Sequence, residues 1–298
     1  MKLICTGDWH LRERPPEARR DDYFQEQNKK LDWVFGLAKR EGAAIVQPGD
    51  FFNSNPPTEF LKQWIIRKIT EKGLRIYTVF GQHDLLHHSL QSLDRTGLSV
   101  LEAAGAVTIL NGRGVLLVKE RVRLVGCHWG QEVPRLRRRE GVTTVLVMHR
   151  MVIKEPLWPG QQADDGAVLL RKYPEYDLII TGDNHQCFMF ESGGRFLFNA
   201  GSLMRMTASQ FTHEPTVGIY DTKGRKFRTV KIPCGPSEKV LSREHIEVVG
   251  ERDERLRKFI ESLKEDYEVG LSFRDNLQQF FEANKVEQSI QDLIWENM

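Results

Sequence analysis

The stretch KLICTGDWH, residues 2–10, joins an apolar run to a Gly-Asp pair and a His. Four more motifs are built in the same way: AAIVQPGDFFN at 43–53, RIYTVFGQHD at 75–84, TTVLVMHR at 143–150 and DLIITGDNH at 177–185. In each, a short run rich in Val, Ile and Leu, typical of a buried strand, ends directly before polar side chains that can bind metal. Five such endings in one chain are hard to assign to chance.

Helical patterns alternate with the first strands. Amphipathic stretches at 23–40, 58–72 and 91–104 follow the first three strands, which indicates parallel strands joined by helical crossovers. After residue 107 the chain changes to short strands with tight turns, and the turns SGG and TKG predict two hairpins, CFMFESGGRFLFNAGS and TVGIYDTKGRKFRTVKI. The sequence therefore predicts an α/β fold: a two-sheet β-sandwich flanked by helices.

A composition shift after IPCGPSEK marks a boundary at Pro233, Gly235 and Pro236. We expect one domain over 1–235 and a small, mainly helical capping or partner-binding segment over 236–298. One helix is expected within 252–267. The apolar stripe expected on a second helix consists of Leu277, Phe280, Phe281, Ile290, Leu293 and Ile294. Such stripes pack on the parent domain or bind a partner, and the sequence leaves both interpretations open.

Composition limits the class of protein. The chain has 298 residues, of which 40% are hydrophobic and 28% charged, so it suits a folded protein and not a disordered one. A net charge of +2 excludes coating of nucleic acid through overall charge, so any such footprint is local. The four widely spaced cysteines, predicted to be reduced core residues, are Cys5, Cys127, Cys187 and Cys234. Without a signal peptide or an apolar span, we expect a cytoplasmic protein that does not enter membranes.

The polar residues after the strands form a candidate metal centre. Asp8 and His10 are two residues apart, and Asp183 and His185 repeat this spacing, which lets each pair point to one side in extended backbone. Asp50 can bridge two ions because a carboxylate has two oxygens. Ligand sites of open α/β sheets lie at the carboxyl ends of the strands. The candidate ligands are Asp8, His10, Asp50, Gln82, His149, Asp183 and His185.

Carboxylate, amide and imidazole ligands together suit two Mn²⁺ ions, with Mg²⁺, Fe²⁺ or Zn²⁺ as alternatives. Each residue has a plainer interpretation, since Asp often caps a turn and a lone His is often a hydrogen-bonded structural residue. Only the whole set favours the metal site. His128, in GCHWG, is expected to be structural.

These motifs resemble the calcineurin-like metallophosphoesterase superfamily, whose pattern is GDxH, GDxx, GNH(D/E), a lone His after a strand, and GHxH. Within it the chain most resembles SbcD-type DNA repair nucleases, through GDWHL, GDFFNSNPP, GQHD, VMHR and NAGSLMR. The resemblance covers about residues 1–232 and is weak over 240–298. It implies a four-layer α/β/β/α fold and a two-metal-dependent DNA nuclease, acting as an exonuclease, an endonuclease or both. It further implies DNA repair, recombination or replication as the setting, an SbcC-like ABC-type ATPase as partner, and homodimerisation as an open question.

The resemblance also implies a role for each site residue. The ligands of the first ion would be Asp8, His10, Asp50 and His185. The ligands of the second ion would be Asp50, Gln82, His149 and Asp183. His83 would donate a proton to the departing oxygen or steady the phosphoryl oxygens, and Asp84 would orient His83 or cap a turn.

Two positions depart from the family pattern, and both fall on the second ion. Gln82 stands where the family has Asn, and Asp183 stands where it has the first His of GHxH. Gln adds a methylene group, while Asp adds a negative charge that favours harder ions such as Mn²⁺ or Mg²⁺. Asn53 stands where some members have a further His, so its role in orienting substrate stays open.

Arginine-rich runs are the candidates for local contacts with DNA. The candidate DNA-binding residues are Arg12, Arg14, Asn53, Arg135, Arg137 and Arg138. A solvated surface loop is the plainer interpretation of the run PRLRRRE. Two alternatives to a nuclease also stay open: a phosphodiesterase or phosphatase acting on nucleotides or other small phosphoesters, and a DNA-binding assembly subunit with a weakened second metal site.

Overall fold

The computed structural model describes residues 1–155, 163–242 and 273–296. The chain divides into two compact units, Met1–Ser242 and Arg243–Met298. The sequence boundary placed residues 236–242 in the C-terminal segment, but these residues contact the first unit. Leu241 is buried, and the Ser242 backbone N–H donates to the Ala18 carbonyl at 2.7 Å.

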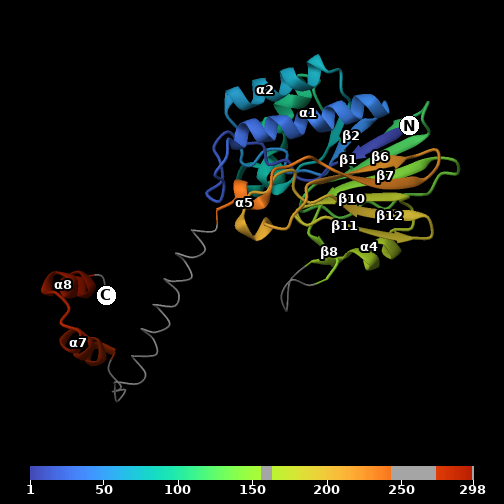
Figure 1. Cartoon of the computed structure of the whole chain (residues 1–298). Helices are drawn as coiled ribbons and strands as arrows, with labels where there is room; N and C mark the ends of the chain where they lie inside the picture. The colour runs from blue at the N-terminus through green and yellow to red at the C-terminus, as the bar shows by residue number, and fades with distance from the viewer. Residues whose placement is uncertain (156–162, 243–272, 297–298) are drawn as a thin grey trace. The chain divides into compact units, whose positions relative to one another are not determined.

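Two six-stranded sheets form the first unit (Figure 1). The first sheet has the order β14-β13-β1-β2-β3-β4, formed by Lys226–Lys231, Thr216–Asp221, Lys2–Cys5, Ala44–Gln47, Ile76–Thr78 and Thr108–Ile109. The second has the order β11-β12-β10-β7-β6-β5, formed by Phe188–Ser192, Arg195–Asn199, Leu178–Gly182, Thr143–His149, Val122–Cys127 and Val115–Leu117. A short pair joins β8 (Val152–Ile153) to β9 (Asp164–Asp165).

Strand pairing follows the sequence pattern. Strands β1 to β4 pair in parallel, and β6, β7, β10 and β12 do the same in the second sheet. The two hairpins predicted from SGG and TKG are confirmed as the antiparallel pairs β11–β12 and β13–β14. The carboxyl ends of β1, β2 and β3 therefore lie at one edge of the first sheet, and those of β7 and β10 at one edge of the second.

Helices cover the outer faces of the sheets. On the first sheet lie α1 (Tyr23–Glu41), α2 (Glu59–Glu71) and α3 (Gly97–Ala103), and on the second lies α4 (Gly166–Lys172) (Figure 1). The continuous helical stretch predicted at 91–104 is wrong, because it is split into the 3₁₀ helix η3 (Leu90–Arg95) and α3. The Thr96 hydroxyl accepts from the Ser99 N–H and so caps a new helix start. Short helices elsewhere are η1 (Gln82–Asp84), η2 (Leu86–His88), η4 (Ala208–Gln210) and α5 (Ser237–Val240).

Successive strand residues face different layers of the core. Leu3 packs between the two sheets, whereas Ile4 packs against the helices of the first sheet. In the second sheet Val147 faces the space between the sheets, and Leu146 faces α4. Strands buried on both faces explain why these segments read as unbroken apolar runs. The predicted four-layer α/β/β/α architecture is confirmed.

All four cysteines are free thiols, but they are not all in the core. Cys5 and Cys127 are buried, as predicted. For Cys187 and Cys234 the prediction is wrong, because both are exposed. Both lie outside the strands: Cys187 directly precedes β11, and Cys234 follows the end of β14 by three residues.

The second unit contains α7 (Phe273–Ala283) and α8 (Gln288–Glu296). The sequence placed one helix here, but the apolar stripe is divided between two. The Phe281 side chain is buried, and its ring lies 5.6 Å from that of Trp295. The helix predicted within 252–267 lies outside the described residues. In the described part of the chain, no helix combines the length and the apolar character needed to cross a bilayer.

Candidate metal centre

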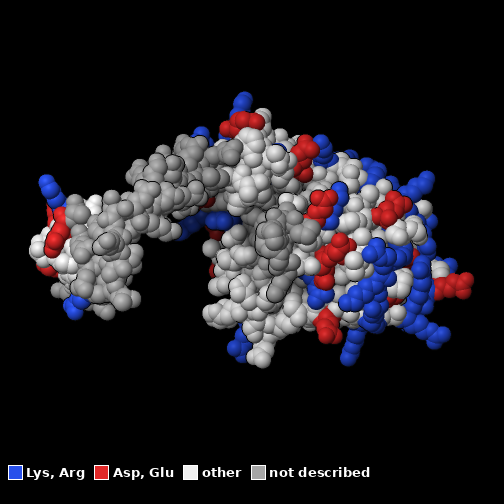
Figure 2. Space-filling model, turned by 90° about the horizontal axis from the view of Figure 1, so that it is seen from below, with Lys and Arg blue, Asp and Glu red and all other residues white. Residues whose placement is uncertain are grey.

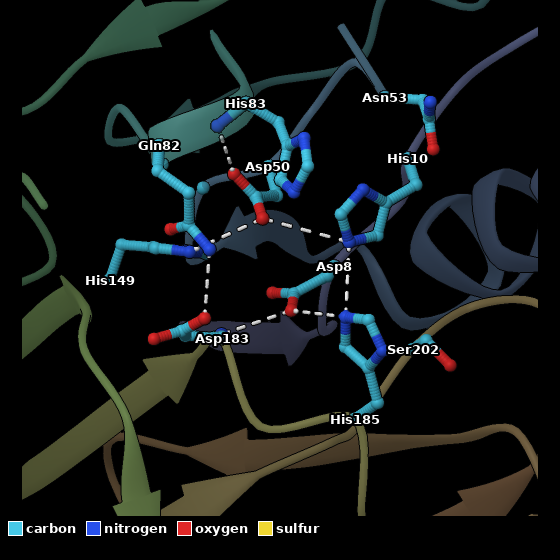
Figure 3. A network of polar contacts seen from close by, with 12 residues as sticks. Asp8, His10, Asp50, Asn53, Gln82, His83, His149, Asp183, His185 and Ser202 are labelled. Carbon is cyan, nitrogen blue, oxygen red and sulfur yellow. Dashed lines mark hydrogen bonds and ion pairs between the residues drawn. The ribbon is translucent and has the colours of Figure 1, made fainter. Parts of the chain in front are cut away.

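Loops at the carboxyl ends of five strands bring the candidate ligands into one cluster (Figure 3). The loops after β1, β2 and β3, in the first sheet, carry Asp8, His10, Asp50, Gln82 and His83. The end of β7 and the loop after β10, in the second sheet, carry His149, Asp183 and His185. The cluster therefore joins the two sheets at one end of the sandwich.

The residues assigned to the first ion lie within contact distance of one another. The His10 Nε2 lies 3.1 Å from the His185 Nε2 and 3.6 Å from the Asp50 Oδ2. The His185 Nε2 lies 3.5 Å from the Asp8 Oδ2. Ligand atoms of Asp8, His10 and His185 all lie within 4.8 Å of one another, as one shared cation requires.

The residues assigned to the second ion meet on the other side of Asp50. The His149 Nε2 lies 3.4 Å from the Asp50 Oδ2, the same oxygen that faces His10. Asp50 therefore occupies the central position expected of a bridging carboxylate. The two departures from the family pattern are in direct contact, since the Gln82 Nε2 donates to the Asp183 Oδ1 at 2.8 Å.

Five buried polar atoms of the candidate ligands have no hydrogen-bond partner within the described chain. One is the His10 Nδ1, and the other four are the Asp8 Oδ1, the Asp50 Oδ2, the Gln82 Oε1 and the His149 Nε2. A buried polar atom without a partner costs about 1–3 kcal/mol, so these four, of which the Asp50 Oδ2 and the His149 Nε2 lie 3.4 Å apart, favour a common partner. Carboxylate and amide oxygens with an imidazole nitrogen fit divalent cations, and these residues are suited to hold them.

Backbone contacts orient the ligands. The His149 Nδ1–H donates to the Pro48 carbonyl at 2.7 Å, which directs the lone pair of its Nε2 into the cluster. The Asp50 Oδ1 accepts from the His83 backbone N–H at 2.9 Å, and the Asp8 Oδ2 accepts from the Asp183 N–H at 3.0 Å. Each carboxylate is held on one oxygen, and its other oxygen faces the cluster.

Glycines before the ligands permit this close approach. A Cβ at Gly81 would lie 2.1 Å from the Asp50 Oδ1. A Cβ at Gly182 would lie 2.5 Å from the Asp8 Oδ1 and 2.8 Å from the His149 Nδ1. Gly81 and Gly182 are therefore needed for space at the cluster.

The cluster is strongly coupled electrostatically. Burial opposes a charge on His149, but the carboxylates of Asp50, Asp8 and Asp183 outweigh it and raise the pKa of His149 to about 10. Burial lowers the pKa of His10 to about 3, although Asp50 acts in the opposite direction. A cation that binds the His149 Nε2 therefore has to displace a proton.

We expect metal affinity to rise with pH, by about tenfold per unit between about pH 7 and 9, because the proton on His149 is bound below its raised pKa and is lost on metal binding. Calorimetric titration with Mn²⁺ in buffers of different ionisation enthalpy measures the protons released. In His149→Gln the release should fall by one proton. An unchanged release would contradict this assignment.

Asp84 holds two loops together. Its buried carboxylate accepts from the backbone N–H groups of Gly81, Phe51 and Phe52, at 3.0, 3.2 and 2.9 Å. Burial and the nearby Asp50 raise its pKa to about 7, while these N–H groups act to lower it. The sequence left two roles open for Asp84, orienting His83 or capping a turn. These contacts are those of a residue that caps a turn.

Asp84→Ala should destabilise the protein by about 3 kcal/mol, because three buried N–H groups lose their acceptor. For a unit of this size the melting temperature should fall by roughly 6–12 °C. Differential scanning calorimetry beside the exposed Asp94→Ala is the measurement. A variant that melts like the parent but has lost activity would restore the role of orienting His83.

Three of the candidate DNA-binding residues lie beside the cluster. Arg12 and Arg14, with Asn53, line a groove of about 400 Å³, and the Arg12 Nη1 donates to the Asn53 Oδ1 at 3.5 Å. Asn53 lies next to His10 (Figure 3). This groove contains two arginines and Glu13, and it adjoins the cluster through Asn53.

The structure does not bring the other three to the cluster. The Arg135 guanidinium lies 4.3 Å above the Tyr173 ring, and the Arg138 Nη2 donates to the buried Asp177 at 2.8 Å. Asp177 precedes β10 and Asp183 follows it, so Arg138 is roughly 17 Å from the cluster. Arg137 is exposed on the same segment. Figure 2 shows many Lys and Arg side chains at one end of the first unit, to the right in that view.

Two asparagines with a structural role at the site were not predicted from the sequence. The Asn199 Nδ2 donates to the carbonyls of Asn184 and Gln186, each at 2.6 Å, and the Asn184 Nδ2 donates to the Val152 carbonyl at 2.8 Å. They fix the loop that carries Asp183 and His185. The only sequence signal was the Asn before the turn in NAGS. His128 is structural, as predicted, since its buried ring accepts from the Phe80 N–H at 3.2 Å.

Comparison with known proteins places this geometry in a family. Among solved structures, the Thermus thermophilus protein TT1561 is 13% identical, with 78% of this chain and 99% of that chain covered and a TM-score of 0.49. A novel archaeal phosphodiesterase is 14% identical, with 78% and 99% covered and a TM-score of 0.43. A candidate 5′-nucleotidase of Staphylococcus aureus is 13% identical, with 79% and 55% covered and a TM-score of 0.50, which supports the fold alone. No curated protein sequence gives a significant match. The model of the calcineurin-like phosphoesterases matches residues 1–187, and the chain belongs to this family.

Proposed function

We propose that the protein is a two-metal-dependent phosphodiesterase that hydrolyses DNA as a nuclease. The observation that carries this proposal is the set of four buried ligand atoms without partners, which face one another across the two sheets beside His83. Two divalent ions, with Mn²⁺ as the expected pair, would supply charge neutralisation and a nucleophilic water when bound. The first would be held by Asp8, His10 and His185, the second by Gln82, His149 and Asp183, and Asp50 would contact both.

His83 is positioned to act on the phosphate. Its ring lies 5.0 Å from that of His10, at the edge of the cluster, and the side chain is only partly buried. The backbone bond to Asp50 holds its loop, so the ring is free to donate a proton to the departing oxygen. From this position the His83 ring can pass its proton directly to the leaving group.

Charge distribution supports DNA as the substrate. Residues 1–242 carry 35 Lys and Arg against 27 Asp and Glu, whereas residues 243–298 carry 8 against 14. The positive excess therefore belongs to the unit that contains the metal centre. The Arg12 and Arg14 groove adjoins the ligands, and the motifs resemble DNA repair nucleases. A phosphate backbone on this groove would place a phosphodiester at the cluster.

Turnover with Mn²⁺ on duplex DNA ends and on bis(4-nitrophenyl) phosphate tests the proposal. We expect both to be hydrolysed, and Arg12→Gln/Arg14→Gln to lose DNA cleavage about tenfold or more while the small ester is unaffected. The matched control is Lys39→Gln/Arg67→Gln, on α1 and α2, which should cleave DNA like the parent. Cleavage of small esters alone would replace the nuclease by a phosphodiesterase of small substrates.

The C-terminal unit is the proposed attachment point for an SbcC-like ATPase. Helices α7 and α8 carry the partly buried Phe280 and the exposed Ile290, while Phe281 is buried against Trp295. Helices of this kind bind apolar grooves or coiled coils. A chain ending at Ser242 should keep metal binding and small-ester hydrolysis and lose association with the ATPase, as measured by analytical ultracentrifugation. Failure of that chain to fold would favour the packing role.

A further inference from the structure

A cavity of about 720 Å³ opens beside the metal cluster, on the side of Asp183 and His185. The loop after β10 and the segment around η4 form its walls. The other lining residues that matter here are Gln186, Thr207, Ser209 and Thr212. A group bound in this cavity would be attached, through one ester oxygen, to a phosphate held at the cluster.

The cavity wall is suited to uncharged polar groups. The hydroxyls of Thr207 and Ser209 lie 2.8 Å apart, and both residues are exposed. The buried Gln210 holds this wall in place, because its Oε1 accepts from the Met206 N–H at 2.6 Å and its Nε2 donates to the Ser202 Oγ at 2.7 Å. Hydroxyl and amide groups on a fixed wall can hydrogen-bond a sugar or a base.

The described residues that line this cavity include no Lys or Arg. Its acidic members are Asp183 and Glu214, and Glu214 is already paired with Lys231 at 2.6 Å. A second phosphate placed here would find no Lys or Arg side chain among the lining residues, since Lys231 is paired with Glu214. A site that leaves a charged group of the ligand without an opposite charge selects against that group.

The opposite side of the cluster has the opposite character. Asn53 lies beside His10, whereas Asp183 and His185 lie across the cluster from it (Figure 3). The groove on the Asn53 side contains Arg12 and Arg14 with one acidic residue, Glu13, which accepts from the Thr58 hydroxyl. The two groups esterified to the phosphate of a phosphodiester would therefore meet different surroundings, one with two arginines and one without Lys or Arg.

We propose that the cavity beside Asp183 and His185 binds an uncharged group the size of a nucleoside and excludes a second phosphate from that side. The part of the substrate that carries the remaining phosphates then lies along the groove that contains Arg12 and Arg14. The inference rests on the proposed phosphodiesterase function. It adds which kind of group, esterified to the phosphate, the site prefers on the side of the cavity. A substrate whose nucleoside in the cavity ends in a free hydroxyl is then favoured over one that continues into another phosphate.

Four 4-nitrophenyl phosphodiesters of thymidine test this: the 3′-ester and the 5′-ester, each with and without a phosphate on the other hydroxyl. For the faster isomer, the added phosphate should lower kcat/KM at least about fivefold. Thr212→Lys places a cation in the cavity and should recover most of this loss. Thr229→Lys, at an exposed position of β14, is the matched control and should recover none.

Binding without turnover gives a second readout. In the calorimetric titration of thymidine 3′,5′-bisphosphate and thymidine, Thr212→Lys should tighten only the bisphosphate, by about fivefold or more. If none of the four diesters is hydrolysed, the proposed function fails. If they are hydrolysed equally well with and without the second phosphate, or if Thr212→Lys and Thr229→Lys respond alike, the inference alone is overturned.

Discussion

His83→Ala should lower phosphodiester hydrolysis about 10³-fold while both metal ions stay bound, because a positioned proton donor contributes typically 10²–10⁴-fold. The contact between this residue and Asp50 is made by the backbone N–H, which alanine retains. The variant therefore keeps the loop and loses only the ring at the edge of the cluster. Single-turnover rates with saturating Mn²⁺ and metal counting by mass spectrometry measure the two properties separately.

The leaving group sharpens this test. A nitrophenolate departs without a proton, so the defect of His83→Ala should shrink to less than about tenfold on nitrophenyl esters. His87→Ala is the matched control, since this neighbouring ring is exposed and should matter less than about threefold. Ligand atoms of His10, Asp50 and His83 lie within 4.8 Å of one another, so loss of one ion from His83→Ala would identify the ring as a metal ligand instead.

Gln82→Asn and Asp183→His should each weaken the second ion by about 10–100-fold, the range found when an orienting contact is lost, whereas the double variant should lie within about threefold of the parent. The Gln82 amide donates to the Asp183 carboxylate at 2.8 Å, and its Oε1 stays buried and faces the cluster. Asn is too short to keep that contact. A His at 183 removes its acceptor, so only the two changes together recreate a matched pair.

Dissociation constants of the two ions, measured by calorimetry on the four proteins, complete this double-mutant cycle. Additive losses would mean that Gln82 and Asp183 act independently. A parent with one ion and no hydrolysis, together with a double variant that binds two ions and is active, would favour the assembly subunit with a weakened second site. Gln82 and Asp183, the two residues that depart from the family pattern, are in direct contact. This contact indicates that they were replaced together, because unrelated losses would leave no bond between them.

Much of the fold could be predicted because both sheets are buried on both faces. Leu3 and Ile4 face different layers, and both are apolar, so the strand reads as an unbroken run. The split at Thr96 could not be predicted, since a capping hydroxyl there competes with an otherwise continuous helical pattern. Cys187 lies one residue before β11 and Cys234 lies three residues after β14, so neither is held in a strand of the core.

The ligands could be predicted because each follows its strand directly, and strand ends gather at one edge. Contacts between distant segments could not. The partners of Asp84 lie at residues 51 and 52, the partner of Arg138 is Asp177, and Gln82 meets Asp183 from 101 positions away. The cavity wall around η4 also depends on Gln210, whose bonds to Met206 and Ser202 leave no periodic pattern in the sequence.

The ligands come from both sheets of the sandwich, so a bound ion would be a cross-link between its two halves. The affinity for metal and the spacing between the layers are then thermodynamically linked. Val46 and Val147 are fully buried between the sheets and bind no ion. A smaller side chain at Val46 or Val147 would let the two sheets shift and would weaken metal binding, although neither residue touches an ion. Conversely, chelation of the ions would loosen the packing of the core between the sheets.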